Sequence, residues 1–152
     1  MITKTLQIEQ LDEKMQELKF LAHIFLPAKG WIRSIRKTIG MSQLQLAKKL
    51  SVTNQSIHEL EKREEDGSVT LRILSDAANA LDMKLVYGIV PKDGSLDALI
   101  NRKANELAEK IVMRAAQTMK LEDQQVSEER IKKAIKERTE SLKIELPKIL
   151  WD

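Results

Sequence analysis

The chain has 152 residues and a mass of 17.4 kDa, enough for one ordinary domain or a small domain with helical extensions, and too little for most two-domain enzymes. Its residues are 42% hydrophobic and 32% charged but only 3% aromatic, a composition that favours long helices over β-sandwiches or barrels. The absence of cysteine excludes disulfide frameworks, cysteine-ligated zinc and thiol nucleophiles.

Other classes of site are disfavoured by residue spacing. His23 and His58 lie far apart in the sequence, so we expect neither a metal site nor a cofactor. The N-terminal residues include Asp and Glu and no apolar run of secretory or membrane-spanning length, so we expect a cytoplasmic protein without membrane contact. No phosphate-binding glycine loop and no nucleophile with a plausible base is present, so we do not expect an enzyme.

The net charge of +3 is small, but the charges are unevenly distributed along the chain. Residues 1–30, 68–95 and 96–152 carry nearly equal numbers of basic and acidic side chains. Residues 31–58, by contrast, contain five basic residues and no acidic residue. An excess of this kind indicates either a solvated face or a surface that meets phosphates.

The first predicted element is a helix from Thr5 to about Phe25. Its apolar residues recur three and four positions apart, like the seam of a short coiled coil, and Pro27 and Gly30 end the pattern. We expect this helix either to cover its own domain or to add contact area to a dimer.

Three short helices are predicted next. The first spans Trp31–Ile39. The second begins at Ser42, which forms a capping box with Gln45, and the third follows the N-cap Thr53 and ends near Arg63. In the first of these helices we expect Ile32, Ile35 and Ile39 to face inward and Arg33, Arg36 and Lys37 to face outward.

A fourth periodic helix is predicted over Leu71–Leu81, after which the pattern changes. Residues 84–90 are rich in β-branched and aromatic residues and stop at Pro91, which predicts one short β-strand. A single strand leaves its edges unpaired, so it must pair with a second copy, with a partner protein or with another segment. Antiparallel pairing between two subunits would use Leu85, Val86, Tyr87 and Ile89 as dimerisation residues.

Residues 43–61 have the spacing of a helix-turn-helix. Ala47 is small where the second helix crosses the first, and Ile57 and Leu60 pack that second helix onto the core. The segment resembles the lambda-repressor-like, or Cro-type, helix-turn-helix family, whose pattern runs Q-x-x-L-A-x-x-x-G-V-S-x-x-x-I-x-x-x-E. Ser51 stands where the family prefers Gly, so the left-handed turn costs more here.

The predicted fold is therefore mainly α, with a lambda-repressor-like helix-turn-helix core, helical extensions at both ends and the short strand. Leu96–Met119 and Glu128 to about Glu145 form two further helices before Pro147. The predicted organisation is an N-terminal helix at 1–29, a DNA-binding domain at 30–83, a strand and turn at 84–95, and a helical region for dimerisation or partner binding at 96–152.

The resemblance to this family assigns roles to individual residues. Asn54, Gln55 and Glu59 are expected to project toward the bases of the major groove. The expected phosphate contacts are Gln43, Thr53, Ser56, Lys62, Arg33, Arg36, Lys37 and Lys48. Thr53 is expected to act mainly as a cap, Glu59 is as readily a solvated residue, and His58 is expected to be a packed or surface residue.

Segments on both sides of the helix-turn-helix show a second resemblance, which extends over most of the chain. Segments around Gly30–Arg36, Leu85–Tyr87, Gly94–Leu96 and Thr118–Gln124, with the terminal Leu150–Trp151–Asp152, resemble the family called mobile mystery protein A. That resemblance implies a DNA-binding regulator of mobile elements, an antitoxin and autorepressor encoded beside a Fic-domain partner. A helix-turn-helix regulator is expected to bind a palindromic double-stranded DNA operator as a homodimer.

An alternative is a protein that mainly inhibits the Fic-domain partner and binds DNA only secondarily. Inhibitors of Fic domains contain a helix with the pattern [S/T]-x-x-x-E-[G/N]. Thr5 with Glu9 and Thr118 with Glu122 have that spacing, but Gln10 and Asp123 follow where Gly or Asn is required.

Overall fold

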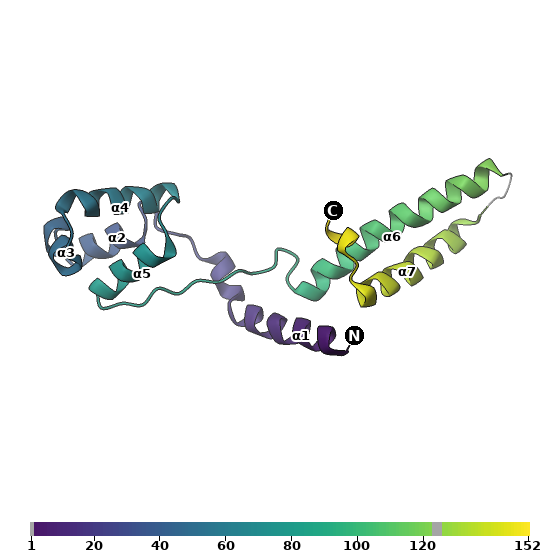
Figure 1. Ribbon diagram of the computed structural model, residues 1–152, viewed down its shortest axis with the longest axis horizontal. Coiled ribbons are helices and arrows are strands. Elements are labelled where there is room, and N and C mark those ends of the chain that lie inside the picture. The colour runs from purple at the N-terminus through teal and green to yellow at the C-terminus, as the bar shows by residue number, and fades with distance from the viewer. Residues whose placement is uncertain (1, 123–125) are drawn as a thin grey trace. The chain divides into compact units, whose positions relative to one another are not determined.

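The computed structural model describes residues 2–122 and 126–152, in which the regular elements are helices (Figure 1). The helices are α1 (Ile2–Glu17), α2 (Trp31–Thr38), α3 (Gln43–Leu50), α4 (Asn54–Asp66), α5 (Leu71–Ala80), α6 (Leu96–Leu121) and α7 (Glu128–Glu145), with 3-10 helices η1 (Lys19–His23) and η2 (Lys148–Trp151). Within these ranges no helix is both long enough and apolar enough to cross a membrane.

The chain divides into two compact units. One consists of His23–Tyr87 and the other of Met1–Ala22 together with Gly88–Asp152. The predicted organisation separated residues 1–29 from residues 96–152, whereas the structure places α1 and α6 in one unit, because α1 packs against α6.

The unit of residues 23–87 contains α2, α3, α4 and α5, which Figure 1 shows gathered around one another. Its core takes side chains from all four helices. The buried members are Ile32, Leu46, Ala47, Ile57, Ala77 and Leu81. Ala47 is fully buried where α3 and α4 pack, as the small side chain predicted. Ile39, by contrast, was predicted to face inward and is 54% exposed, because α2 ends at Thr38 and Ile39 is its C-cap.

The caps predicted for the two helices of the motif are confirmed. Ser42 Oγ accepts a hydrogen bond from the Gln45 backbone N–H at 3.1 Å, and Gln45 Oε1 accepts one from the Ser42 N–H at 2.8 Å, which completes a capping box. Thr53 Oγ1 accepts from the Ser56 N–H at 3.1 Å. Ser51 has φ 55° and ψ 42°, so the turn does require the left-handed conformation that glycine adopts more readily.

Helix α4 is longer than predicted and continues through the acidic residues 64–66 to Gly67, which caps it with φ 82°. The extension has a structural role. The Glu64 carboxylate accepts hydrogen bonds from the backbone N–H groups of Trp31 and Ile32, at 2.7 and 2.9 Å. Gly30 has no side chain to cap α2. Glu64, more than thirty residues further along the chain, therefore accepts the hydrogen bonds of the free backbone N–H groups in the first turn of that helix.

The other unit is built on a helical hairpin of α6 and α7, which lie side by side in Figure 1. Its buried cluster is Ala104, Ala108, Leu142 and Leu150. Helix α1 joins it through side chains that bind the start of α6. Asp12 accepts hydrogen bonds from the N–H groups of Leu96 and Asp97, at 2.6 and 3.2 Å, and Gln16 donates to the Gly94 carbonyl at 2.7 Å. The helix predicted to reach Phe25 ends at Glu17, because the chain tightens into η1.

The predicted strand at 84–90 is not observed. In the described part of the chain these residues form no ladder with another segment. A strand needs a neighbour to satisfy its backbone groups, and the single chain brings none alongside. Val86, Tyr87 and Ile89 are 70%, 69% and 78% exposed, and Leu85 is half-buried.

Candidate nucleic-acid interface

A buried ion pair between α2 and α4 organises the surface on which the predicted DNA contacts lie. The side chains of Arg36 and Glu61 are only 8% and 4% exposed. Arg36 Nη2 donates to Glu61 Oε1 at 2.7 Å, its Nε donates to both carboxylate oxygens, and its Nη1 donates to the Met41 carbonyl at 2.9 Å. The pair therefore ties α2 to α4 and to the loop that leads into α3.

Arg36 was predicted to face outward and to contact phosphate, and its outward placement is wrong. Its guanidinium lies in the interior, where a carboxylate and a carbonyl take its N–H groups. A buried carboxylate must be paired to remain charged, and Glu61 is the glutamate that ends the family pattern. A glutamate at this fixed position of the pattern is the sequence signal from which a buried partner could have been predicted.

Gln43 bridges the two helices of the motif. Its Nε2 donates to Glu61 Oε1 at 3.3 Å, so the first residue of α3 is linked to the middle of α4. Its side chain is half-buried and also borders the open surface. Gln43 thus braces α4 and remains accessible for the predicted phosphate contact.

A hollow of about 710 Å³ lies between α2, the start of α3 and α4. Arg33 and Lys37 line it from α2, and Asn54, His58 and Lys62 line it from α4. Arg36 also lines this cationic hollow, which runs along α4, and so do the carboxylates of Glu61 and Glu65. Arg33, Arg36 and Lys37 come from the acid-free region 31–58, whereas Lys62 lies outside it.

One carboxylate at the edge of this hollow is neutralised from within the chain. Lys29 Nζ donates to Glu65 Oε1 at 2.8 Å. This hydrogen bond, with the nearby positive charges of Lys29 and Arg33, lowers the pKa of Glu65 below its ordinary value. Glu65 is therefore ionised near neutral pH, and Lys29 offsets its charge.

The first turn of α4 presents the other predicted residues. Asn54 and Gln55 are exposed, and neither side chain caps the helix. Thr53 and Ser56 are exposed too, and their hydroxyls are hydrogen-bonded to each other at 2.8 Å. Because Thr53 Oγ1 also accepts from the Ser56 N–H, it has the capping role expected of it.

The structure does not bring all three predicted base contacts to one place. Asn54 lines the cationic hollow, but Glu59 lines a different hollow of about 310 Å³, together with Arg63 and Asp76. Lys48 is exposed near the C-terminal end of α3 and lines neither hollow. Asn54 thus shares the cationic hollow with the predicted residues of α2, with Gln43 and with Lys62, while Ser56 and Glu59 line the hollow toward α5.

His58, expected to be a packed or surface residue, is exposed and lines the cationic hollow with Asn54 and Lys62. The signal that places it there is its spacing. Residues four apart on a helix lie on the same face, so Asn54, His58 and Lys62 form one row along α4. Within residues 2–122 and 126–152 no group of three or more metal-ligating side chains is assembled.

Residues 32–87 match the family model described as helix-turn-helix. This stretch is an XRE-type helix-turn-helix domain. Its two motif helices are α3 and α4, joined by the left-handed turn at Ser51. The domain indicates a DNA-binding transcriptional regulator. Comparisons with curated proteins and with solved structures find no match to the chain.

Proposed function

We propose that the protein binds a specific palindromic sequence of double-stranded DNA as a homodimer, with α4 as the recognition helix. The observation that carries this proposal is the first turn of α4, where Asn54 lines a hollow together with Arg33, Lys37 and Lys62. The next residue, Gln55, is exposed in the same turn. In helix-turn-helix domains the N-terminal residues of the second helix contact base edges in the major groove. Asn and Gln bind adenine through two hydrogen bonds.

The other side chains of this surface hold the DNA backbone. Arg33, Lys37, Lys48 and Lys62 supply positive charge, which makes binding strong at low salt and weaker as salt rises. Gln43 and the hydroxyls of Thr53 and Ser56 donate or accept hydrogen bonds at the groove edge. Arg36 acts from the interior by holding α2 against α4. Glu59 makes its base contact from the side of α4 that faces α5.

The experiment measures how two kinds of protein variant bind DNA that carries the inverted repeats upstream of the gene. Lys37→Ala removes a phosphate contact, so binding should weaken for every sequence and the salt slope should fall by about 0.9. Gln55→Ala removes a base contact, so the preference for the operator should fall by about 5- to 150-fold, equivalent to about 1–3 kcal/mol. Lys4→Ala, an exposed lysine of the other unit, is the matched charge control. Unchanged operator preference in Gln55→Ala overturns the recognition assignment.

A two-fold arrangement supports this function because one recognition helix reads too few base pairs for specificity. Two copies would place their recognition helices about 34 Å apart, one turn of the double helix. The exposed residues Val86, Tyr87 and Ile89, with the half-buried Leu85, suit antiparallel pairing between two copies, which would supply the missing neighbour strand. The helical unit offers a second route to the same dimer.

The resemblance to mobile mystery protein A supports a more particular role. In this proposal the protein is a non-enzymatic antitoxin of the cytoplasm that represses its own operon, and a Fic-domain protein encoded beside it is the partner. Co-purification of the two gene products tests the partnership, and absence of a complex contradicts it without affecting DNA binding.

The alternative, direct inhibition of the Fic-domain partner with secondary DNA binding, rests on two short matches. Thr5 and Glu9 lie on α1, and Thr118 lies near the end of α6, whose C-cap is Glu122. Asp123, which departs from the inhibitor pattern, and Gln124 of the family-like segment lie outside the described residues. A complex that retains full Fic activity contradicts this alternative.

A further inference from the structure

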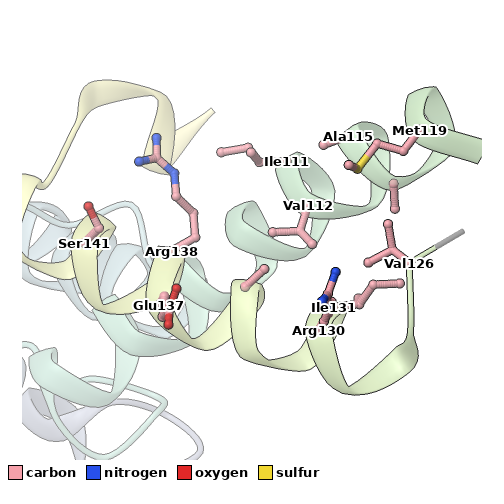
Figure 2. A pocket seen from close by; sticks show the side chains of 12 residues that line it. Ile111, Val112, Ala115, Met119, Val126, Arg130, Ile131, Glu137, Arg138 and Ser141 are labelled. Carbon is pink, nitrogen blue, oxygen red and sulfur yellow. The ribbon is translucent and has the colours of Figure 1, made fainter. Parts of the chain in front are cut away.

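An apolar hollow of about 460 Å³ lies between the C-terminal half of α6 and the N-terminal part of α7 (Figure 2). Figure 2 shows side chains of both helices around it, with charged groups of α7 at its border. The apolar lining includes Ile111, Val112, Ala115 and Met119 of α6 and Ile131 and Ala134 of α7. The charged lining residues are Arg130, Glu137 and Arg138.

This half of the hairpin has no core of its own. The buried side chains of α6 are Ile100, Ala104 and Ala108, and those of α7 are Thr139 and Leu142, so all of them lie at the other end. Over residues 109–121 and 126–138, every side chain is at least partly exposed. Two helices can bury only the narrow strip between them, and an antiparallel pair of helices is half of a four-helix bundle.

The charged residues on α7 are placed so that two antiparallel copies of the helix complement each other. Arg130 and Glu137 are seven residues apart and border the same hollow. In the described part of the chain the Arg130 guanidinium makes no ion pair, and the Glu137 carboxylate reaches only Lys133, at 4.0 Å and with both side chains exposed. When a helix lies antiparallel to its copy with the two-fold axis midway between these positions, Arg130 of each copy meets Glu137 of the other.

The residue near that axis permits a close approach. Ala134 lies between Arg130 and Glu137, lines the hollow and is half-buried. Small side chains at the crossing point allow the axes of two helices to come near each other. Apolar side chains in the centre with charged groups at the border are also the usual anatomy of a protein interface.

We infer that a second copy of this chain docks on the hollow, with α7 antiparallel to α7 of the other copy and the two hairpins forming a four-helix bundle. The interface buries the apolar lining and makes two symmetry-related ion pairs between Arg130 and Glu137. This inference deepens the proposed homodimer by naming its surface, and it assigns that surface to the α6–α7 hairpin in preference to residues 85–89.

Charge exchange tests the arrangement on the full-length protein by sedimentation equilibrium. The wild-type chain should be a dimer. Arg130→Glu and Glu137→Arg each create two like-charge contacts and should weaken the dimer at least tenfold. An equimolar mixture of the two variants restores both pairs in a heterodimer, and so does the double variant Arg130→Glu/Glu137→Arg. Both should return the dissociation constant to within about threefold of wild type.

Lys132→Glu is the matched control, because Lys132 is exposed on α7 but does not line the hollow. The dissociation constant of the Lys132→Glu dimer should equal that of wild type. Far-UV circular dichroism verifies that every variant keeps its helices. A monomeric wild-type chain, including one that associates only with another protein, overturns the inference. Single variants that dimerise like wild type, or a mixture that fails to recover, overturn it as well.

Binding to a single DNA half-site separates this inference from the proposed function. A monomeric Arg130→Glu chain should still bind one half-site, because the helix-turn-helix lies in the other unit. Loss of the dimer with retained half-site binding supports the hairpin interface. A chain that dimerises normally and binds no DNA instead contradicts the proposed DNA binding alone.

Discussion

At the scale of residues, the helix-turn-helix domain combines local helix caps with one ion pair between residues that are distant in the sequence. The capping box of Ser42 and Gln45, the cap at Thr53 and the left-handed turn at Ser51 each depend on residues within a few positions of one another. Arg36 was misplaced because its burial depends on Glu61, twenty-five residues away, and periodicity along one helix carries no information about such a partner.

The buried pair predicts an asymmetric response to mutation. Arg36→Met leaves Glu61 charged and unpaired in the interior, so the free energy of unfolding should fall by about 3–5 kcal/mol. Arg36→Met/Glu61→Leu removes both charges and should recover most of that loss. Urea unfolding followed by Trp31 fluorescence in a Trp151→Phe background measures both. A double variant no more stable than the single variant contradicts this account of the pair.

The loop before α6 predicts a pH dependence. Arg102 donates to both oxygens of Asp93, at 2.8 and 3.0 Å, and holds the pKa of that carboxyl below its ordinary value of 3.8. A lowered pKa in the folded state means that the stabilisation is present above about pH 3.8 and is lost as the pH falls through the folded-state value. The small stability difference between wild type and Asp93→Asn should therefore be constant well above pH 3.8 and shrink as the pH falls below it. A difference that does not shrink below pH 3.8 contradicts the pairing.

At the scale of elements, the hydrophobic pattern identified the helices but not all their ends. It ended α4 too early because an acidic run resembles a loop, whereas Glu64 in that run caps α2. It extended the first helix too far, because spacing alone does not distinguish an α-helix from the 3-10 helix that follows. The strand at 84–90 failed for a different reason, since β-forming residues produce a strand only where a neighbour pairs with them.

The junction of α1 and α6 depends on one carboxylate. Asp12 accepts the N–H groups of Leu96 and Asp97, so Asp12→Ala should cost about 1 kcal/mol and speed amide exchange in the first turn of α6 and in α1. Glu13→Ala, at the neighbouring exposed position, is the control. Hydrogen exchange measured by mass spectrometry should show the change for Asp12→Ala only. Equal exchange in the two variants contradicts the role of Asp12.

At the scale of the whole molecule, the helix-turn-helix could be found from sequence because its residues are contiguous. Its domain extends over residues 32–87, and the predicted DNA-binding domain of residues 30–83 covers almost the same stretch. The second unit could not be found in this way, because it joins residues 1–22 to residues 88–152 across the whole intervening domain. Only contacts such as Asp12 with Leu96 reveal that connection.

The division into two units predicts that residues 23–87 fold alone. That fragment contains its own buried core and the complete Arg36–Glu61 pair, so it should unfold in one cooperative thermal transition. Its affinity for the operator should be at least tenfold weaker than that of the full chain, because the fragment lacks the hairpin. A fragment without a cooperative transition contradicts the independence of this unit.

Selection of binding sites from a randomised double-stranded DNA library tests the central claim most directly, with the full-length chain and Gln55→Ala treated in parallel. The wild-type chain should enrich an inverted repeat whose half-sites are about 34 Å apart, one helical turn. Gln55→Ala should lose the preference at one position of each half-site and keep the spacing. Failure of the wild-type chain to enrich any sequence would contradict the claim that this surface reads DNA.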